Sequence, residues 1–173
     1  MQDVNVVVVF YSRTGSTERL ALAAAVGAVQ GRALIRLRRL PDSADEAAIE
    51  SDPEWKRNLV RMNKEFIAPR EVDAIWADAI VVGTPAGGDA LSTEFRRYFE
   101  SLDILRTQGK LEGKIGAAFT QGSSADALRQ AMSGLGLKTV PAITHPNTQE
   151  GARLQGRAVA EAARSQRAAR AAV

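Results

Sequence analysis

The feature that most constrains the fold is a run of branched apolar residues that ends abruptly in hydroxyl groups. Residues 4–11 read VNVVVVFY, and residues 12–17 read SRTGST. An uninterrupted β-branched run is typical of a strand buried on both faces, as in parallel sheets covered by helices. An Ala- and Leu-rich segment follows over residues 17–29 and ends at Gly31. The start of the chain therefore predicts a strand, a polar loop and a helix.

Strand and helix patterns alternate about five times along the chain. Further strands are expected at residues 32–40, 79–83, 114–120 and 138–144, and helices at 92–105, at 125–133 and from about 149. Short loops between alternating strands and helices are typical of an open, doubly wound parallel sheet. Because ligands bind at the carboxyl ends of the strands in such sheets, the loops after the first, third and fourth strands should meet in space.

The segment between the second and third strands is charged and irregular, yet it carries an apolar stripe at helical spacing. The stripe consists of Trp55, Leu59, Met62 and Phe66. Asp52 and Pro53 supply an N-cap and a first-turn proline. We expect a helical insertion at about 42–70 within a single domain, 1–173. The stripe is expected to be buried against the sheet or a neighbouring subunit; the alternative is that it lends an aromatic ring to a ligand pocket.

Composition excludes several chemistries. The chain has 173 residues and no cysteine, which excludes disulfides, Cys-ligated metals and cysteine nucleophiles. His145 is the only histidine, so a His-rich metal site is excluded and a Ser-His-Asp triad is disfavoured. We assign no metal site. No apolar stretch is long enough to cross a membrane, and the first residues lack the pattern of a secretion signal, so we expect a cytoplasmic protein.

The net charge of +3 is concentrated near the end of the chain. Residues 151–173 hold five arginines against Glu161 alone, a net +4, which leaves −1 for the other 150 residues. No aromatic residues are interleaved with these arginines, so no nucleic-acid partner is expected. A basic, solvated C-terminal helix at about 149–170 is the simpler account.

The loop at residues 12–17 places four hydroxyl groups and Gly15 between a strand and the N-terminus of a helix. Free backbone N–H groups and the helix dipole favour an anion there, and a glycine lets the backbone approach it closely. A phosphate group is the expected occupant; the alternative is that the hydroxyl groups only cap the helix. The dinucleotide fingerprint and the P-loop lysine are absent, which disfavours dinucleotides and nucleoside triphosphates. Arg13 either pairs with the phosphate or lies exposed on the surface.

Three loops carry a family resemblance. Residues 12–18, SRTGSTE, match the flavodoxin phosphate-loop pattern Thr/Ser-x-Thr-Gly-x-Thr at each specified position. Residues 81–85, VVGTP, with the glycine-containing loop after them and Phe95–Arg96, are similar to the NAD(P)H:quinone oxidoreductase branch of that superfamily, often called tryptophan-repressor-binding-protein-like. Residues 118–123, AFTQGS, resemble the third FMN loop of this family. The likeness follows nearly the whole chain in order.

The resemblance implies a flavodoxin-like α/β fold, a doubly wound five-stranded parallel sheet of order 2-1-3-4-5 with helices on both faces, and noncovalently bound FMN. The implied phosphate-binding residues are Ser12, Arg13, Thr14, Gly15, Ser16 and Thr17. The implied isoalloxazine-binding residues are Pro85, Ala86, Gly87, Gly88, Asp89, Thr120, Gln121, Gly122 and Ser123. The glycines would let backbone N–H groups reach the polar edge of the ring, or they form turns only. Asp89 either contacts the flavin or caps the next helix.

The sequence departs from the family in two places. The loop at 85–89 has no aromatic residue to stack on the flavin; such a contact contributes on the order of 1 kcal/mol, so FMN affinity is expected to be about tenfold lower. The segment after the fifth strand is shorter than in the quinone reductases, where it helps to build the nicotinamide and quinone pocket. His145 lies in this segment and is the one candidate catalytic residue; the alternative is a loop histidine without a chemical role.

The leading interpretation is an FMN-dependent oxidoreductase that reduces quinones or similar small acceptors with NADH or NADPH, by hydride transfer through the flavin. The alternatives are a flavodoxin-type electron carrier and a non-catalytic flavodoxin-like binding module. Electron carriers of this type are generally strongly acidic, and this chain is not. The resemblance also implies a homo-oligomer, either a dimer or a tetramer.

Overall fold

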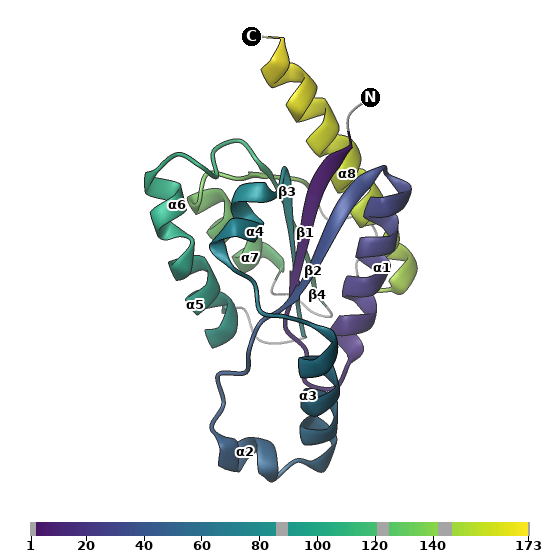
Figure 1. Cartoon of the computed structure of the whole chain (residues 1–173), viewed down its shortest axis with the longest axis vertical. Coiled ribbons are helices and arrows are strands. Elements are labelled where there is room, and N and C mark those ends of the chain that lie inside the picture. Colours follow the sequence, from purple (N-terminus) through teal and green to yellow (C-terminus); the bar gives the residue numbers. More distant parts are fainter. Residues whose placement is uncertain (1–2, 86–89, 121–124, 142–146, 173) are drawn as a thin grey trace.

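The chain folds around a five-stranded parallel sheet (Figure 1). The computed structural model describes residues 3–85, 90–120, 125–141 and 147–172. In chain order the strands are β1 (Val4–Phe10), β2 (Ala33–Arg39), β3 (Ala79–Thr84), β4 (Ile115–Thr120) and β5 (Lys138–Thr139). Their order across the sheet is β2-β1-β3-β4-β5, and all neighbours are parallel. The predicted fold class and the strand order 2-1-3-4-5 are confirmed.

Helices cover both faces of the sheet, as predicted. On one face lie α1 (Ser16–Gln30) and α8 (Gln149–Ala171); on the other lie α4 (Glu71–Trp76), α5 (Thr93–Ser101), α6 (Asp103–Thr107) and α7 (Ala125–Gly134). Strand β1 contributes to both cores, because Val6 and Val8 pack towards the first pair of helices while Val7 and Val9 pack towards the second group. All four valines are fully buried. The unbroken apolar run of β1 is therefore the consequence of two covered faces.

Two helices, α2 (Glu46–Glu50) and α3 (Pro53–Glu65), follow β2 along the chain and precede α4. They project beyond the carboxyl edge of the sheet, next to the first turn of α1 (Figure 1). The predicted cap is confirmed: the Asp52 carboxylate accepts hydrogen bonds from the backbone N–H groups of Glu54 and Trp55, both at 3.1 Å, and Pro53 occupies the first turn. After α3, Ile67 forms a single parallel bridge with Arg38.

Three elements differ from the sequence-based expectations. The helix predicted at 92–105 is interrupted at Leu102, whose N–H bonds to Phe99 and so closes a tighter turn between α5 and α6. The fifth strand, predicted at 138–144, spans only Lys138–Thr139 among the described residues, although Val140 still bonds to Gly116. Helix α4 was not predicted because its six residues are too few for a periodic pattern.

Candidate functional site

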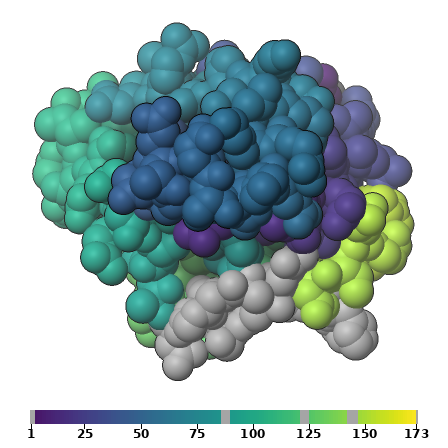
Figure 2. Space-filling model, turned by 90° about the horizontal axis from the view of Figure 1, so that it is seen from below, coloured from purple at the N-terminus to yellow at the C-terminus, as the bar shows by residue number. Residues whose placement is uncertain are grey.

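The carboxyl ends of β1, β3 and β4 lie side by side, as the parallel sheet requires. Phe10 is paired with Gly83, and Thr84 with Thr120. The pairing continues past the strands: the Tyr11 N–H bonds to the Gly83 carbonyl at 3.0 Å. Figure 2 looks onto this edge, where the blue residues of the insertion lie in front and purple residues from the start of the chain show at their border. The structure thus brings the carboxyl ends of these three strands, from which the predicted site loops start, to one edge.

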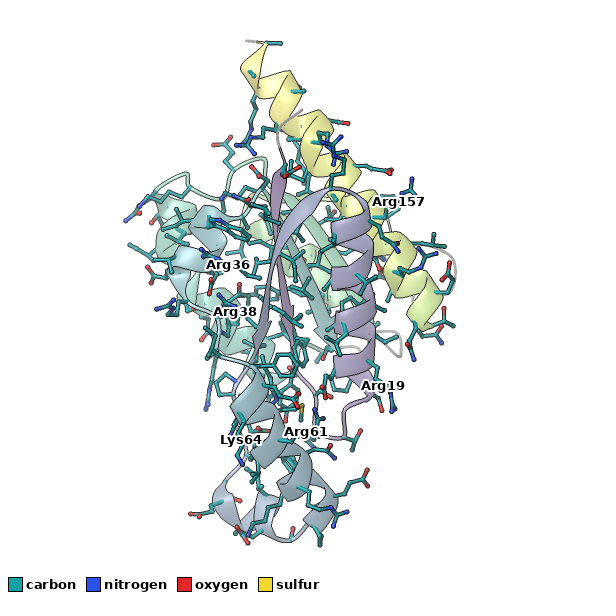
Figure 3. All side chains as sticks on the ribbon, turned by 45° about the vertical axis from the view of Figure 1, so that its right-hand side comes forward. Arg19, Arg36, Arg38, Arg61, Lys64 and Arg157 are labelled. Atoms are coloured by element: carbon teal, nitrogen blue, oxygen red, sulfur yellow. The ribbon has the colours of Figure 1, made fainter. Side chains whose placement is uncertain are left out.

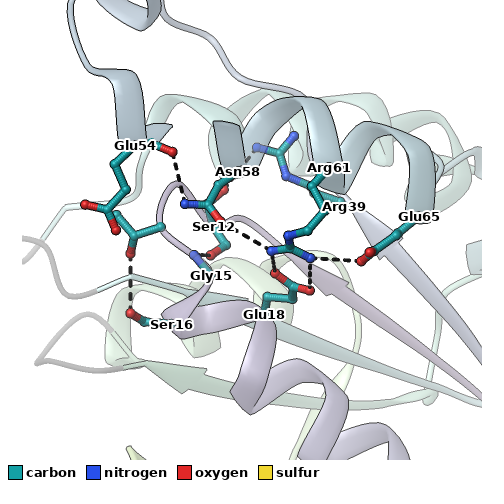
Figure 4. Close-up of polar contacts among 10 residues, drawn as sticks. Ser12, Gly15, Ser16, Glu18, Arg39, Glu54, Asn58, Arg61 and Glu65 are labelled. Atoms are coloured by element: carbon teal, nitrogen blue, oxygen red, sulfur yellow. Dashed lines mark hydrogen bonds and ion pairs between the residues drawn. The ribbon is translucent and has the colours of Figure 1, made fainter. Parts of the chain in front are cut away.

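The loop at residues 12–17 turns sharply into α1 (Figure 4). The Ser12 hydroxyl accepts a hydrogen bond from the Gly15 N–H at 3.0 Å, and the Thr14 and Ser16 hydroxyl oxygens lie 3.3 Å apart. Gly15 has φ 93°, in the left-handed region, where a side chain would be strained. Gly15 is also the N-cap of α1, and within the described residues no side chain caps this helix. In this structure the hydroxyl groups of the loop therefore do not cap α1. The backbone N–H groups of its first turn remain available to bind another acceptor.

A buried hydroxyl group lies at the same helix end without a partner. Thr17 is 1% exposed, and its Oγ1 forms no hydrogen bond in the described part of the chain. Buried hydroxyl groups are nearly always hydrogen-bonded, so an unpaired one indicates a missing acceptor. A phosphate oxygen next to the helix N-terminus would supply that acceptor and would also face the positive end of the helix dipole. The residues present therefore fit a phosphate group.

The side chain of Arg13 is held in place by two aromatic residues. Its Nε donates to the Tyr11 hydroxyl at 3.0 Å, and its guanidinium carbon lies 4.4 Å from the centre of the Trp55 ring. The hydrogen bond with Tyr11 raises the pKa of Arg13 above its ordinary value, although partial burial opposes this. Burial raises the pKa of the Tyr11 hydroxyl, so that group stays protonated at neutral pH. Arg13 is exposed at the loop but fixed in orientation.

The carboxylate of Asp42 connects these aromatic residues to the loop. Its Oδ1 accepts hydrogen bonds from the Tyr11 hydroxyl at 3.0 Å and from the Trp55 indole at 2.9 Å, and its Oδ2 accepts one from Arg39 at 2.8 Å. The same Arg39 nitrogen donates to the Ser12 carbonyl at 3.0 Å. The side chains of Arg39 and Asp42 are only 2% and 5% exposed. Sequence reasoning missed this buried ion pair; an arginine at the end of a strand, followed three residues later by an aspartate at the ligand edge of the sheet, was the available signal.

The predicted apolar stripe is buried in this chain at two of its four positions, while Leu59 and Phe66 are partly exposed. Trp55 and Met62 are buried, and Phe66 packs edge-on against Phe10 with ring centres 5.1 Å apart. Trp55 lends its ring to Arg13 of the loop. The stripe therefore combines a core role with a contact to the candidate site.

A second contact ties α3, which carries Arg61 (Figure 3), to α1 (Figure 4). The guanidinium of Arg61 binds both oxygens of the Glu18 carboxylate, Nη1 to Oε1 at 2.8 Å and Nη2 to Oε2 at 2.6 Å. Arg61 also donates to Glu65 at 2.9 Å. The hydrogen bonds with Glu18 raise the pKa of Arg61 above its ordinary value. Helix α3 is thus fastened beside the phosphate loop at two points, Trp55 and Arg61.

The other two loops are described in part. Pro85 and Thr120 lie at the carboxyl edge, where the Thr120 hydroxyl is 3.5 Å from the Pro85 carbonyl oxygen. The remaining predicted site residues lie outside the described residues: Ala86, Gly87, Gly88, Asp89, Gln121, Gly122, Ser123 and His145. Among the helices that the structure describes, none combines the length and apolarity that a membrane span requires. In the same ranges, no three Asp, Glu or His side chains come together as a metal site would need.

Comparison with known proteins supports the same family. No family model matches the chain. The sequence is 31% identical over 116 residues to the NAD(P)H dehydrogenase (quinone) of Archaeoglobus fulgidus, covering 66% of this chain and 60% of the relative. It is 29% identical over 123 residues to the protein of the same name from Deinococcus radiodurans, covering 71% and 61%. The chain therefore spans less than two thirds of the length of these curated relatives.

The fold has close counterparts among solved structures. The structure of a WrbA-like flavodoxin from Agrobacterium tumefaciens superposes with a TM-score of 0.65 at 22% identity, covering 95% of this chain and 99% of that one. The chain therefore has a flavodoxin-like fold, and over about two thirds of its length its sequence is similar to NAD(P)H dehydrogenases (quinone).

Proposed function

We propose that this protein binds FMN and uses it to pass electrons from NADH or NADPH to a quinone or a similar small acceptor. The observation that carries the proposal is the uncapped first turn of α1 with the buried, unpartnered hydroxyl of Thr17 beside it. This site fits a phosphate group. The names of the curated relatives support the choice of NAD(P)H and a quinone as reactants.

In this proposal the protein holds the cofactor and the cofactor supplies the chemistry, because a bound flavin accepts a hydride and returns electrons to an acceptor. The phosphate would be held by the hydroxyl groups of Ser12, Thr14, Ser16 and Thr17, by the backbone at Gly15 and by the guanidinium of Arg13. Pro85 and Thr120 lie at the edge where the ring would sit, and the other predicted ring-binding residues, 86–89 and 121–123, follow them in the sequence. His145 is the candidate proton donor to the acceptor.

The role of the protein side chains is mainly to orient the cofactor. The ion pair between Arg39 and Asp42 fixes the Ser12 carbonyl, and the stack on Trp55 fixes Arg13. A loop that is already ordered loses less conformational entropy when it binds. We also propose, on the family resemblance, that the protein acts in the cytoplasm as a homo-dimer or homo-tetramer.

A second candidate function is a flavodoxin-type electron carrier. The chain covers 99% of the WrbA-like flavodoxin structure, whereas it covers only 60% of the Archaeoglobus dehydrogenase. If the protein is a carrier, the flavin would exchange electrons with protein partners rather than with NADH and a quinone.

Spectroscopic titration tests the proposal directly. Purified protein is titrated with FMN and, separately, with riboflavin, and flavin fluorescence and absorbance are followed. We expect FMN to bind more tightly than riboflavin, and the Thr14→Ala and Ser16→Ala variants to lose affinity for FMN only. Equal affinity for the two flavins would contradict the phosphate site, and no flavin binding would contradict both candidate functions.

The same sample separates the enzyme from the carrier. NADH or NADPH is added without oxygen to the FMN-loaded protein, and the rate of flavin bleaching is measured, followed by reoxidation with a water-soluble quinone. Rapid bleaching and rapid reoxidation support the oxidoreductase. A flavin that bleaches with dithionite but not with either nicotinamide supports the carrier.

A further inference from the structure

An acidic side chain lies at the helix end that is proposed to bind phosphate. Glu18 is in the first turn of α1, and its carboxylate is 8% exposed. A Cβ placed on Gly15 would lie 3.4 Å from Glu18 Oε2, so the carboxylate lies against the loop itself. A carboxylate in the first turn of a helix is stabilising by itself, because it faces the positive end of the helix dipole. A phosphate bound at the same end would compete with that carboxylate for the positive end of the helix dipole, and the two negative charges would repel each other.

Arg61 of α3 removes this conflict. Its guanidinium binds the Glu18 carboxylate through two hydrogen bonds, and it also lies 3.6 Å from the Cβ position of Gly15 (Figure 4). A bidentate arginine–carboxylate pair is the strongest form of this interaction, and here it offsets the negative charge of a Glu18 side chain that is 8% exposed, although the Arg61 side chain itself is 42% exposed. The charge at the loop is therefore set by a residue 43 positions away along the chain.

The contacts of Arg61 indicate that it acts through Glu18. Nη1 is shared between Glu18 and Glu65, and Nη2 between Glu18 and Asn58, which is 3.4 Å away. Both terminal nitrogens are thus occupied by side chains of the protein. Arg61 is therefore a positioning residue: it holds Glu18 against helix α3, and the loop residues, not Arg61, would contact the phosphate.

We propose that Arg61 sets the selectivity of this flavin site for a phosphorylated ligand by neutralising Glu18. The identity of the ligand as FMN rests on the proposed function; the charge effect applies to any phosphate at the loop. When α3 is docked, the first turn of α1 is free of net negative charge and accepts a phosphate. When Arg61 is lost, Glu18 remains as an uncompensated anion at the same place.

The test is a double-mutant cycle on this pair. The variants are Arg61→Gln, Glu18→Gln and the double variant, with Arg61→Lys as the conservative change. Arg57→Gln is the matched control, because Arg57 is exposed on the same helix and forms no ion pair within the described residues. Each variant is titrated with FMN, riboflavin and inorganic phosphate, the last followed by NMR at the amide groups of Gly15, Ser16 and Thr17. Thermal unfolding of each ligand-free variant checks that it is folded.

Arg61→Gln is expected to lower affinity for FMN and for phosphate about tenfold, the scale of one charge at a helix terminus, and to leave riboflavin affinity unchanged. Glu18→Gln and the double variant are expected to bind phosphate and FMN at least as tightly as the wild type. Arg61→Lys should keep most of the affinity and Arg57→Gln all of it. A loss in Arg61→Gln that the second substitution does not restore, or that is equal for riboflavin, would overturn the proposal.

The phosphate titration keeps this inference separate from the proposed function. If the wild type binds no flavin but its phosphate affinity follows the cycle described, the charge role of Arg61 stands and the FMN proposal fails. If FMN binds and neither FMN nor phosphate affinity responds to Arg61→Gln, the charge role fails and the FMN proposal stands. If Arg61→Gln unfolds, the double variant and Arg61→Lys still decide the question, since the proposal requires both to bind phosphate.

Discussion

The backbone carbonyl of Arg153 occupies the place where a Cβ on Gly27 would lie. The relation is reciprocal, because a Cβ on Gly156 would overlap the carbonyl of Ala24. Helices α1 and α8 therefore touch backbone to backbone, which only glycine permits on both sides. This contact fixes α8 against the helix whose first turn forms the phosphate loop.

Substitution of Gly27 by Ala is expected to destabilise the protein, because the methyl group has no room unless the two helices separate. Overpacking of this kind costs about 1–3 kcal/mol, and we expect the upper part of that range because the atom met belongs to the backbone. The free energy of unfolding in urea measures the effect. Gly134→Ala is the control: a Cβ there meets nothing within 4 Å, so that variant should be as stable as the wild type or more so. Equal stability of the two variants would contradict the close contact.

Replacement of Thr17 by Val separates binding from stability. The Thr17 hydroxyl is buried and unpartnered, so its removal in the ligand-free protein should leave the free energy of unfolding unchanged or slightly higher. FMN affinity should fall by about ten- to a hundredfold, because a hydrogen bond to a charged phosphate contributes roughly 1.5–3 kcal/mol. Urea unfolding and an FMN titration measure the two effects. A variant that is destabilised but binds FMN normally would show that the hydroxyl serves the fold and not the ligand.

Substitution of Asp42 by Asn is expected to lower the free energy of unfolding by about 3 kcal/mol, because it leaves the buried guanidinium of Arg39 without its counter-charge. Urea unfolding measures the change. Asp45→Asn is the matched control, since Asp45 is the exposed N-cap of α2 and asparagine caps a helix equally well. A loss below 1 kcal/mol for Asp42→Asn would mean that water reaches the ion pair.

Stability should depend on pH through Asp73, which two arginines hold in a buried position. Arg36 and Arg38 each lie 3.0 Å from its carboxylate, and the Arg70 N–H donates to it at 2.9 Å. Burial alone would raise the pKa of Asp73, but the hydrogen bonds from Arg38, from the Arg70 backbone and from Arg36 hold it below its ordinary value. A carboxyl group with a lowered pKa in the folded state stabilises the fold above the unfolded pKa, about 3.9.

This contribution is expected to disappear as the pH falls through about 4 and below, towards the folded-state pKa of Asp73. The wild type should therefore lose stability on acidification, measured as the urea midpoint at pH 7 and at pH 3. Asp73→Asn should be less stable at pH 7, by about 3 kcal/mol, and should lose less on acidification. Asp103→Asn, which removes an exposed carboxylate paired with Arg106, is expected to behave like the wild type. A steeper acid response in Asp73→Asn would contradict the assignment.

The parts of this protein that depend on local pattern could be predicted from its sequence. The branched run of β1 indicated a strand covered on both faces, and the regular alternation of strands and helices indicated a parallel sheet with its loops at one edge. The cap at Asp52 and the helix that follows it could also be predicted, because a cap and a periodic stripe are properties of residues that are close in sequence. The phosphate expected at the hydroxyl-rich loop stays a prediction.

The long-range contacts were decided by the tertiary structure alone. Nothing in the spacing of Glu18 and Arg61, or of Asp42 and Trp55, identifies them as partners, because their contacts arise from how α3 packs over the end of the sheet. Likewise, Gly27 and Gly156 read as ordinary helix residues until the crossing of α1 and α8 brings each against a carbonyl group. Periodicity records which face of an element is buried. Which side chains meet across that face depends on the distance and angle between elements, and those emerge only when the whole chain is packed.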